Sequence, residues 1–480
     1  MTRPTALELR ASIARREQTA VAVCRETLER VRLSPPALNA FITVAEERAL
    51  ARATALDREA DSATLPLLGV PVAVKDNICT RGVRTTAGSR VLESYVPPYD
   101  AAVIERLEAA GAVIVAKTNC DEFAMGSSTE HSAFGPSRNP WDQSRTAGGS
   151  SGGSAIAVAT GVVPLALGSE TGGSVRQPAA LCGVIGLKPT YGRISRYGLI
   201  AFASSLDQVG VFGGTVGDVA ACLGVLAGPD PRDATSAPAA VDDYLAATQG
   251  DIRGLRIGIP RALMNEGVEP GIRAAFDASL EQLRASGAVL EDIDLPHSRY
   301  ATATYAVVVM AEASSNLGRF DGVRYGSRGE GHSLAEMYSR TRARFGDEVK
   351  RRIMIGTYVL SAGYYDAYYR KAQQVRSLIR GDFARAFAHV DAIATPTTPT
   401  TAFRLGERLA DPVQMYLADV FTVSANLAGV PALSVPSGLV EGLPSGLQLT
   451  GRAFGEATLL RVAAALERSQ PPGRRFPPVL

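Results

Sequence analysis

Five lysines stand out in a chain whose other basic residues are all arginine. The 480 residues carry 50 basic side chains, of which the lysines are only Lys75, Lys117, Lys188, Lys350 and Lys371. A buried lysine can lose its proton near neutral pH and act as a base, whereas an arginine stays charged. Lys75 follows the apolar run 67–74, which reads as a buried strand, and strand ends often carry functional sites. Lys75 is thus a candidate general base, or else a structural ion-pair partner of a carboxylate such as Asp76.

Two glycine-rich serine clusters could supply a nucleophile. Residues 148–152 match the GxSxG elbow of α/β hydrolases, but the preceding residues are polar and turn-like instead of a strand. The second cluster, 168–174, follows an apolar run, and its glycines allow the N–H groups of residues 171–174 to converge on an anionic oxygen. We therefore expect Ser174 to be a nucleophile beside an oxyanion hole, with Ser150 relaying its proton to Lys75.

Other catalytic and binding motifs are missing from the sequence. The four histidines, His131, His297, His332 and His389, form no HExxH pair, so no metal site is expected and each histidine is expected to be structural. No lysine lies in an SxxK motif, which excludes a β-lactamase-type pair. The ATP-binding pattern GxxxxGK[ST] is also absent, so no cofactor is expected in this chain.

Composition indicates an ordinary globular protein of the cytoplasm. The formal net charge is +2, and 46% of residues are hydrophobic. No run of basic residues suggests a nucleic-acid-binding tail. The five cysteines form no CxxC pair, which favours free thiols in a reducing compartment. No signal peptide and no run of about 18 apolar residues is found, so we expect no membrane contact.

The pattern along the chain predicts an α/β protein. Residues 5–60 have helical spacing with one break at 34–36, which suggests two helices around a turn. Short apolar runs then alternate with amphipathic helices, as in the helix face 103–110 before the strand 112–116 and the helix face 272–283 before the run 288–295. Such alternation predicts a large, mixed but mostly parallel sheet covered by helices on both faces.

No clear linker divides the sequence, so we expect one domain over residues 1–480. We divide it into N-terminal helices (1–60), a catalytic core with the Gly/Ser-rich region (61–295), a helical segment (300–385), and C-terminal strands with a closing helix (390–470). The Gly/Ser-rich region is not read as a flexible linker, because apolar segments such as 156–159 interleave with its glycines.

These serine clusters resemble the amidase signature family. The runs 148–154 and 172–179 carry the likeness, which extends over about residues 5–470. The resemblance implies the amidase signature fold and a Ser-Ser-Lys triad: Lys75 as base, Ser150 as bridging serine after a cis peptide, and Ser174 as acyl-forming nucleophile. By the same resemblance, the oxyanion donors are Thr171, Gly172 and Gly173.

Further motifs resemble the glutamine-hydrolysing subunits of tRNA-dependent amidotransferases within that family. They are residues 121–130, 134–136, 187–193, 356–358, 362–365, 396–399 and 426–429. This likeness implies a glutamine site that contains Tyr305, Arg352, Asp419, Met125 and Ser128. The chemistry fits, because a zwitterionic amino acid needs a cation such as Arg352 for its carboxylate and an anion such as Asp419 for its ammonium. Each of these two residues could also be a structural ion pair.

The resemblance also implies partners. Ammonia from glutamine would pass to a second subunit that binds ATP and Mg²⁺ and amidates misacylated Glu-tRNA(Gln) or Asp-tRNA(Asn), and a third, smaller subunit would complete a heterotrimer. Two alternatives stay open. A free-standing amidase for small amides would not need both Arg352 and Asp419, and a non-catalytic assembly subunit would tolerate loss of Lys75 or Ser174.

Overall fold

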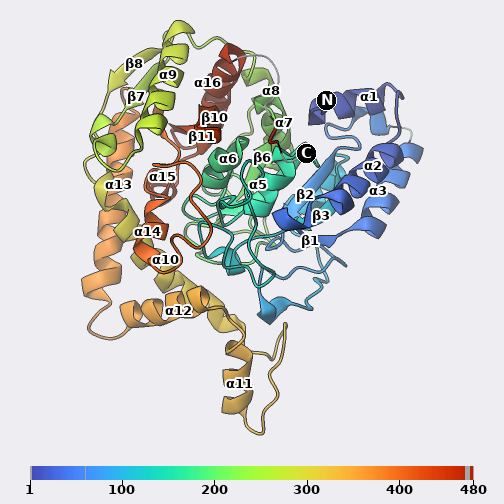
Figure 1. Cartoon of the computed structure of the whole chain (residues 1–480), viewed down its shortest axis with the longest axis vertical. Helices are drawn as coiled ribbons and strands as arrows, with labels where there is room; N and C mark the ends of the chain where they lie inside the picture. Colours follow the sequence, from blue (N-terminus) through green and yellow to red (C-terminus); the bar gives the residue numbers. More distant parts are fainter. Residues whose placement is uncertain (1–2, 60, 471–475, 479–480) are drawn as a thin grey trace.

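One continuous sheet organises the protein. The computed structural model describes residues 3–59, 61–470 and 476–478 (Figure 1). Within these residues, eleven strands lie in the order β1-β3-β2-β4-β6-β5-β10-β11-β9-β7-β8. Their bounds are β1 Phe41–Val44, β2 Pro71–Lys75, β3 Val113–Thr118, β4 Leu165–Glu170, β5 Ile185–Lys188, β6 Gln208–Gly213, β7 Arg256–Ile259, β8 Val289–Asp292, β9 Ala392–Pro396, β10 Ala432–Val440 and β11 Leu443–Gly451.

Helices pack around this sheet, and one helical excursion projects away from it. Figure 1 shows α11 at the far end of that excursion. The helices are α1 Ala6–Ala14, α2 Ala20–Leu33, α3 Glu46–Arg58, α4 Ala102–Ala109, α5 Gly152–Ala159, α6 Arg176–Cys182, α7 Val216–Leu226, α8 Tyr244–Ala247, α9 Pro270–Ala285, α10 Ala301–Asn316, α11 Leu334–Arg342, α12 Asp347–Leu360, α13 Lys371–Ala386, α14 Pro412–Leu417, α15 Val423–Ala428 and α16 Glu456–Ser469. Among the described residues, no helix combines the length and apolar character needed to cross a bilayer.

Alternate residues of the central strands face two separate apolar layers. In β2, Val72 and Val74 pack in a cluster with residues of α4, α7 and α16, whereas Ala73 packs in a cluster with residues of α2, α3, α5 and α6. Every residue of β2 is buried, because helices cover both faces of the sheet. By this alternation Lys75 lies on the same face as Ala73, toward α5.

The predicted α/β class and mixed sheet are confirmed, but parallel pairing is less extensive than expected. Among the described strands, six of the ten neighbouring pairs are antiparallel. The hairpin β10–β11 is one cause. Glu441 and Gly442 both have positive φ (51° and 83°), which suits a two-residue turn between antiparallel strands.

The N-terminal prediction of two helices is wrong. Residues 6–58 form three helices, and β1 lies between α2 and α3 at one edge of the sheet. With only four residues, β1 is too short for its pattern to stand out from the helical spacing around it. The helical segment over 300–385 and the closing helix over 456–468 match α10–α13 and α16.

Candidate active site

Lys75 and Ser150 meet at the end of β2. The Nζ atom of Lys75 donates hydrogen bonds to Ser150 Oγ at 2.7 Å and to the carbonyl oxygen of Ser169 at 3.2 Å. Ser150 follows the cis peptide bond Gly149–Ser150 on the loop before α5. The polypeptide around Ser150 is not a strand-to-helix elbow, so the weak GxSxG match carries no hydrolase geometry.

Burial prepares Lys75 to be a base. The side chain is fully buried, and loss of solvent lowers the pKa of Lys75 to about 8, although nearby acidic groups oppose the shift. The alternative, an ion pair between Lys75 and Asp76, does not occur among the described residues. The carboxylate of Asp76 instead lies 3.9 Å from Lys117 Nζ. The structure thus places the lysine where it can take a proton from Ser150.

Burial alone does not single out Lys75. Lys117 and Lys188 are also fully buried, and burial lowers the pKa of Lys188 to about 7. Lys117 Nζ donates to the carbonyl oxygen of Ile78 and to the hydroxyl of Thr85, and Lys188 Nζ donates to the carbonyl oxygen of Pro189 at 2.7 Å. The contact with a serine hydroxyl in a glycine-rich loop is what distinguishes Lys75.

The loop that carries Ser174 joins β4 to α6. Glu170, at the end of β4, accepts backbone hydrogen bonds from Val175 at 2.9 Å and Arg176 at 3.1 Å. The guanidinium of Arg176 also donates to the Glu170 carboxylate, with Nε at 2.9 Å, and both side chains are fully buried. The backbone N–H of Ser151 donates to the carbonyl oxygen of Ser174 at 3.2 Å. The two serine clusters of the sequence are therefore adjacent in space.

The glycines of this loop are required by close neighbours. A Cβ on Gly172 would lie 2.6 Å from the Tyr305 ring, and one on Gly173 would lie 2.4 Å from Asp419 Oδ1. The N–H groups of Thr171, Gly172 and Gly173 donate to no acceptor in the described part of the chain. Such free donors suit a developing oxyanion, although their role as an oxyanion hole stays a prediction.

Asp419 presents a free carboxylate oxygen beside residues 171–175, the loop between β4 and α6 that we call the glycine loop. Ser127 Oγ donates to Asp419 Oδ2 at 2.5 Å, whereas Asp419 Oδ1 has no hydrogen-bond partner among the described residues. Burial raises the pKa of Asp419 to about 7, and the hydrogen bond from Ser127 opposes that shift. An unpaired, buried carboxylate oxygen next to Gly173 is suited to an ammonium group.

Tyr305 and Arg352 come from two helices packed against each other, α10 and α12. Arg352 Nε donates to Glu348 Oε1 at 2.8 Å, and its guanidinium lies over the rings of Phe202 and Tyr416. The ion pair between Arg352 and Glu348 is therefore structural. Glu348 is hydrogen-bonded to Nε, and the terminal nitrogens of the guanidinium are not bound to it. The structure brings Tyr305 and Asp419 to the glycine loop.

Ser128 lies beside the loop that carries Ser150, whereas Met125 lies in an apolar cluster. The backbone N of Ser128 lies 2.5 Å from where a Cβ of Gly149 would stand, so Ser128 borders the cis peptide. Its hydroxyl accepts a hydrogen bond from the N–H of Glu130. Met125 packs in an apolar cluster that also contains Phe202. Glutamine binding by these two residues stays a prediction.

Several contacts of the site were not predicted. Ser169 lies inside the second glycine-rich cluster and could have been suspected from that location. Glu348 lies four residues before Arg352 in α12, so this ion pair could have been inferred from the helical spacing. Ser127 contacts Asp419 and Thr422 contacts the glycine loop across distant segments, for which the sequence contains no local signal.

Among the described residues, no histidine or cysteine side chain is hydrogen-bonded to Lys75, Ser150 or Ser174, although the buried thiol of Cys120 lies close enough to Lys75 to oppose the lowering of its pKa. His297 contacts Asp382 at 2.9 Å, and all five cysteines are buried and free. No group of three or more potential metal ligands occurs within the described ranges.

Known proteins resemble this chain over almost its full length. The Amidase family model matches residues 22–460. The A subunit of glutamyl-tRNA(Gln) amidotransferase from Chloroflexus aurantiacus is 59% identical over 467 residues, which are 97% of this chain and 96% of that protein. The corresponding protein of Carboxydothermus hydrogenoformans is 55% identical over 469 residues and 97% of each chain.

A solved structure shares the fold as well. The crystal structure of the A subunit of glutamyl-tRNA(Gln) amidotransferase from Thermotoga maritima superposes with a TM-score of 0.82 at 45% identity, covering 95% of this chain and 94% of that one. The resemblance inferred from the serine clusters is confirmed by these matches. The chain therefore belongs to the amidase family.

Proposed function

We propose that this chain is the glutamine-hydrolysing subunit of a tRNA-dependent amidotransferase. Its full-length likeness to proteins named as the A subunit of glutamyl-tRNA(Gln) amidotransferase supports the assignment. The observation that carries the chemistry is the 2.7 Å contact between buried Lys75 and Ser150, next to the Ser174 loop. The free Oδ1 of Asp419 favours an amino-acid substrate over a simple amide, because it can bind an ammonium group.

In the proposed reaction, neutral Lys75 takes the proton of Ser150 while Ser150 takes the proton of Ser174. Ser174 Oγ attacks the side-chain amide carbon of glutamine, and the N–H groups of residues 171–173 bind the resulting oxyanion. When the C–N bond breaks, the proton on Lys75 returns through Ser150 to the leaving nitrogen, and ammonia departs.

Water then attacks the Ser174 ester. It gives one proton to Lys75 through Ser150, and that proton returns to Ser174 Oγ as glutamate leaves. Every step uses the same two serines and one lysine, which requires that Lys75 gain and lose a proton twice per turnover. An arginine could not do so, since its pKa is too high.

The fate of ammonia is the second part of the proposal. We place this chain in a cytoplasmic heterotrimer, in which a larger partner binds ATP, Mg²⁺ and the misacylated Glu-tRNA(Gln) or Asp-tRNA(Asn), and a smaller partner completes the complex. The partner, not this chain, would activate the tRNA-linked carboxylate with ATP and accept ammonia. The likeness to proteins named as one subunit of an amidotransferase supports this division of labour.

The test is a comparison of nitrogen donors in the purified complex. Co-expressed with its two partner subunits, the wild-type chain should support amidation of misacylated tRNA with glutamine or with ammonium chloride. The Ser174→Ala complex should lose the glutamine-dependent reaction and keep the ammonium-dependent one. If Ser174→Ala still uses glutamine at the wild-type rate, the proposed mechanism is wrong. If the isolated chain hydrolyses simple amides faster than glutamine, the free-standing amidase is correct.

A further inference from the structure

The hydroxyl of Thr422 contacts the glycine loop from a distant part of the chain. Thr422 is fully buried at the start of α15, three residues after Asp419. Its Oγ1 donates a hydrogen bond of 2.6 Å to the carbonyl oxygen of Gly172. The same atom lies 2.9 Å from the carbonyl oxygen of Asp419, so the single hydroxyl proton has its shorter contact with Gly172.

That contact determines where the next N–H points. The peptide unit between Gly172 and Gly173 is trans, so its C=O and N–H bonds point in opposite directions. With the carbonyl of Gly172 held by Thr422, the N–H of Gly173 is directed away from Thr422. The carbonyl of Gly173 is held in turn by the N–H of Gln177 at 2.8 Å, which orients the N–H of Ser174 in the same way.

Thr422 is itself fixed by groups other than its hydroxyl. Arg176 donates to the carbonyl oxygen of Thr422 at 2.9 Å. The N–H groups of Thr422 and Val423 donate to the carbonyl oxygen of Asp419 at 3.0 and 3.2 Å. These backbone contacts persist when the hydroxyl is removed, so the carboxylate of Asp419 should keep its place.

We propose that Thr422 is a positioning residue for the oxyanion hole. Its hydroxyl orients the Gly172–Gly173 peptide so that the N–H of Gly173 faces the oxyanion that forms when Ser174 attacks. Asp419 and Thr422 then divide two tasks within one short segment: the carboxylate of Asp419 binds the substrate ammonium, and the hydroxyl of Thr422 prepares the transition state. This inference rests on the proposed glutamine hydrolysis.

The test separates kcat from KM in the heterotrimer. Thr422→Val keeps the side-chain shape and removes the hydroxyl. We expect kcat for glutamine hydrolysis to fall by about 10- to 100-fold, less than the roughly 10²–10³ typical of losing an oxyanion donor outright. KM should stay within about twofold, because the contacts of Asp419 persist. Thr422→Ser keeps the hydroxyl and should restore most of kcat.

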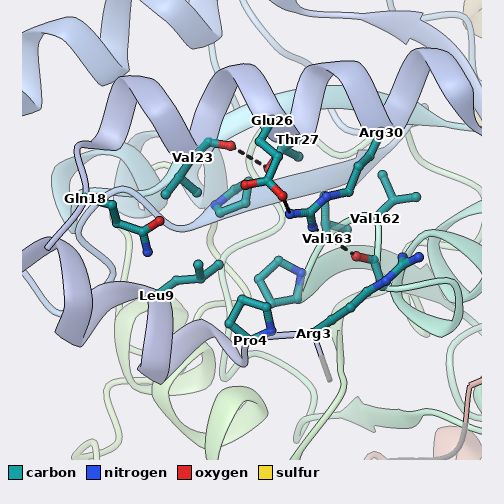
Figure 2. A pocket seen from close by; sticks show the side chains of 13 residues that line it. Arg3, Pro4, Leu9, Gln18, Val23, Glu26, Thr27, Arg30, Val162 and Val163 are labelled. Atoms are coloured by element: carbon teal, nitrogen blue, oxygen red, sulfur yellow. Dashed lines mark hydrogen bonds and ion pairs between the residues drawn. The ribbon is translucent and has the colours of Figure 1, made fainter. Parts of the chain in front are cut away.

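A matched control is available in α2. Thr27 is also buried, and its hydroxyl donates to the carbonyl oxygen of Val23 at 2.8 Å (Figure 2). Thr27→Val also removes a hydrogen bond from a buried hydroxyl to a backbone carbonyl oxygen, but in α2, which is distant in sequence from the glycine loop. This variant should leave kcat and KM at wild-type values. A loss of kcat shared by Thr27→Val and Thr422→Val would show a general packing effect and overturn the proposal.

Ligand affinities give a second readout. A boronic acid analogue of glutamine that forms a tetrahedral adduct with Ser174 should bind Thr422→Val more weakly, by about the same factor as kcat falls, whereas glutamate should bind equally well. A valine variant with wild-type kcat, or a serine variant as slow as valine, would overturn the inference.

The folding state of each variant is checked by its thermal unfolding. If Thr422→Val does not fold, Thr422→Cys replaces it, because a thiol is only a weak donor. A kcat of the cysteine variant equal to that of Thr422→Ser would then refute the role of the hydroxyl. A wild-type complex that does not hydrolyse glutamine would instead refute the proposed function, independently of Thr422.

Discussion

Reaction of Ser174 with a neutral electrophile should follow the ionisation of Lys75. We expect the rate of modification by phenylmethanesulfonyl fluoride to rise with pH, with a midpoint near the Lys75 pKa of about 8. The direction follows from the chemistry, since only the neutral amine can accept a proton from Ser150. The reagent has no ammonium group, so ionisation of Asp419 should not affect the rate.

The magnitude follows from the shift of the pKa. With a pKa of about 8, roughly 9% of Lys75 is neutral at pH 7, compared with about 0.03% for an ordinary lysine of pKa 10.5. Burial therefore increases the reactive fraction by about 300-fold, equivalent to about 3 kcal/mol. Between pH 6 and the plateau, the rate should change by about 100-fold.

The assay measures labelling of the Ser174 peptide by mass spectrometry at pH values from about 5.5 to 10. Ser174→Ala should show no label at this peptide. Lys75→Arg should react slowly and without the sigmoidal pH dependence, because the guanidinium stays charged. Lys350→Arg changes a partly exposed lysine and should match the wild type. A midpoint above pH 10, or a Lys75→Arg rate within a few-fold of wild type, would refute the reasoning.

Four further outcomes are expected. Asp419→Asn should raise KM for glutamine by about 10- to 100-fold, as expected for a charge-assisted hydrogen bond. The wild-type KM should fall as pH rises through about 7, because Asp419 ionises there, and steady-state kinetics would test both. Gly172→Ala should abolish hydrolysis without preventing assembly, since its methyl would lie 2.6 Å from the Tyr305 ring. Glu170→Gln should lower the unfolding free energy by about 3–5 kcal/mol, measured by denaturant titration, because it leaves the charge of Arg176 buried without its counter-ion; a loss below about 1 kcal/mol would contradict this.

The proposed catalytic residues were accessible to sequence reasoning because their signals are local. Lys75 follows an apolar run, and Ser174 follows another run and two glycines, so strand ends and flexible turns could be inferred within a few residues. The residues proposed to bind glutamine were different. Arg352 and Asp419 have no local pattern of their own, and only the family resemblance pointed to them.

The remaining differences between the sequence-based predictions and the structure arise from pairing between distant segments. The pattern of β10 is compatible with either strand direction, and only the turn at Glu441–Gly442 fixes it as antiparallel to β11. The contact between Thr422 and Gly172 spans 250 residues, and nothing in the composition around either residue indicates it. Contacts between distant segments were therefore harder to predict from the sequence than the residue types that could carry out the chemistry.

The order of the strands has a consequence for biosynthesis. β10 and β11 lie between β5 and β9, so the two parts of the sheet become continuous only when these strands are in place. Lys75, Ser150 and Ser174 emerge from the ribosome long before Asp419 and the two strands that follow it. A nascent chain would thus have the proposed triad residues but lack the carboxylate of Asp419 that we propose binds the substrate's ammonium group, so we expect it not to hydrolyse glutamine.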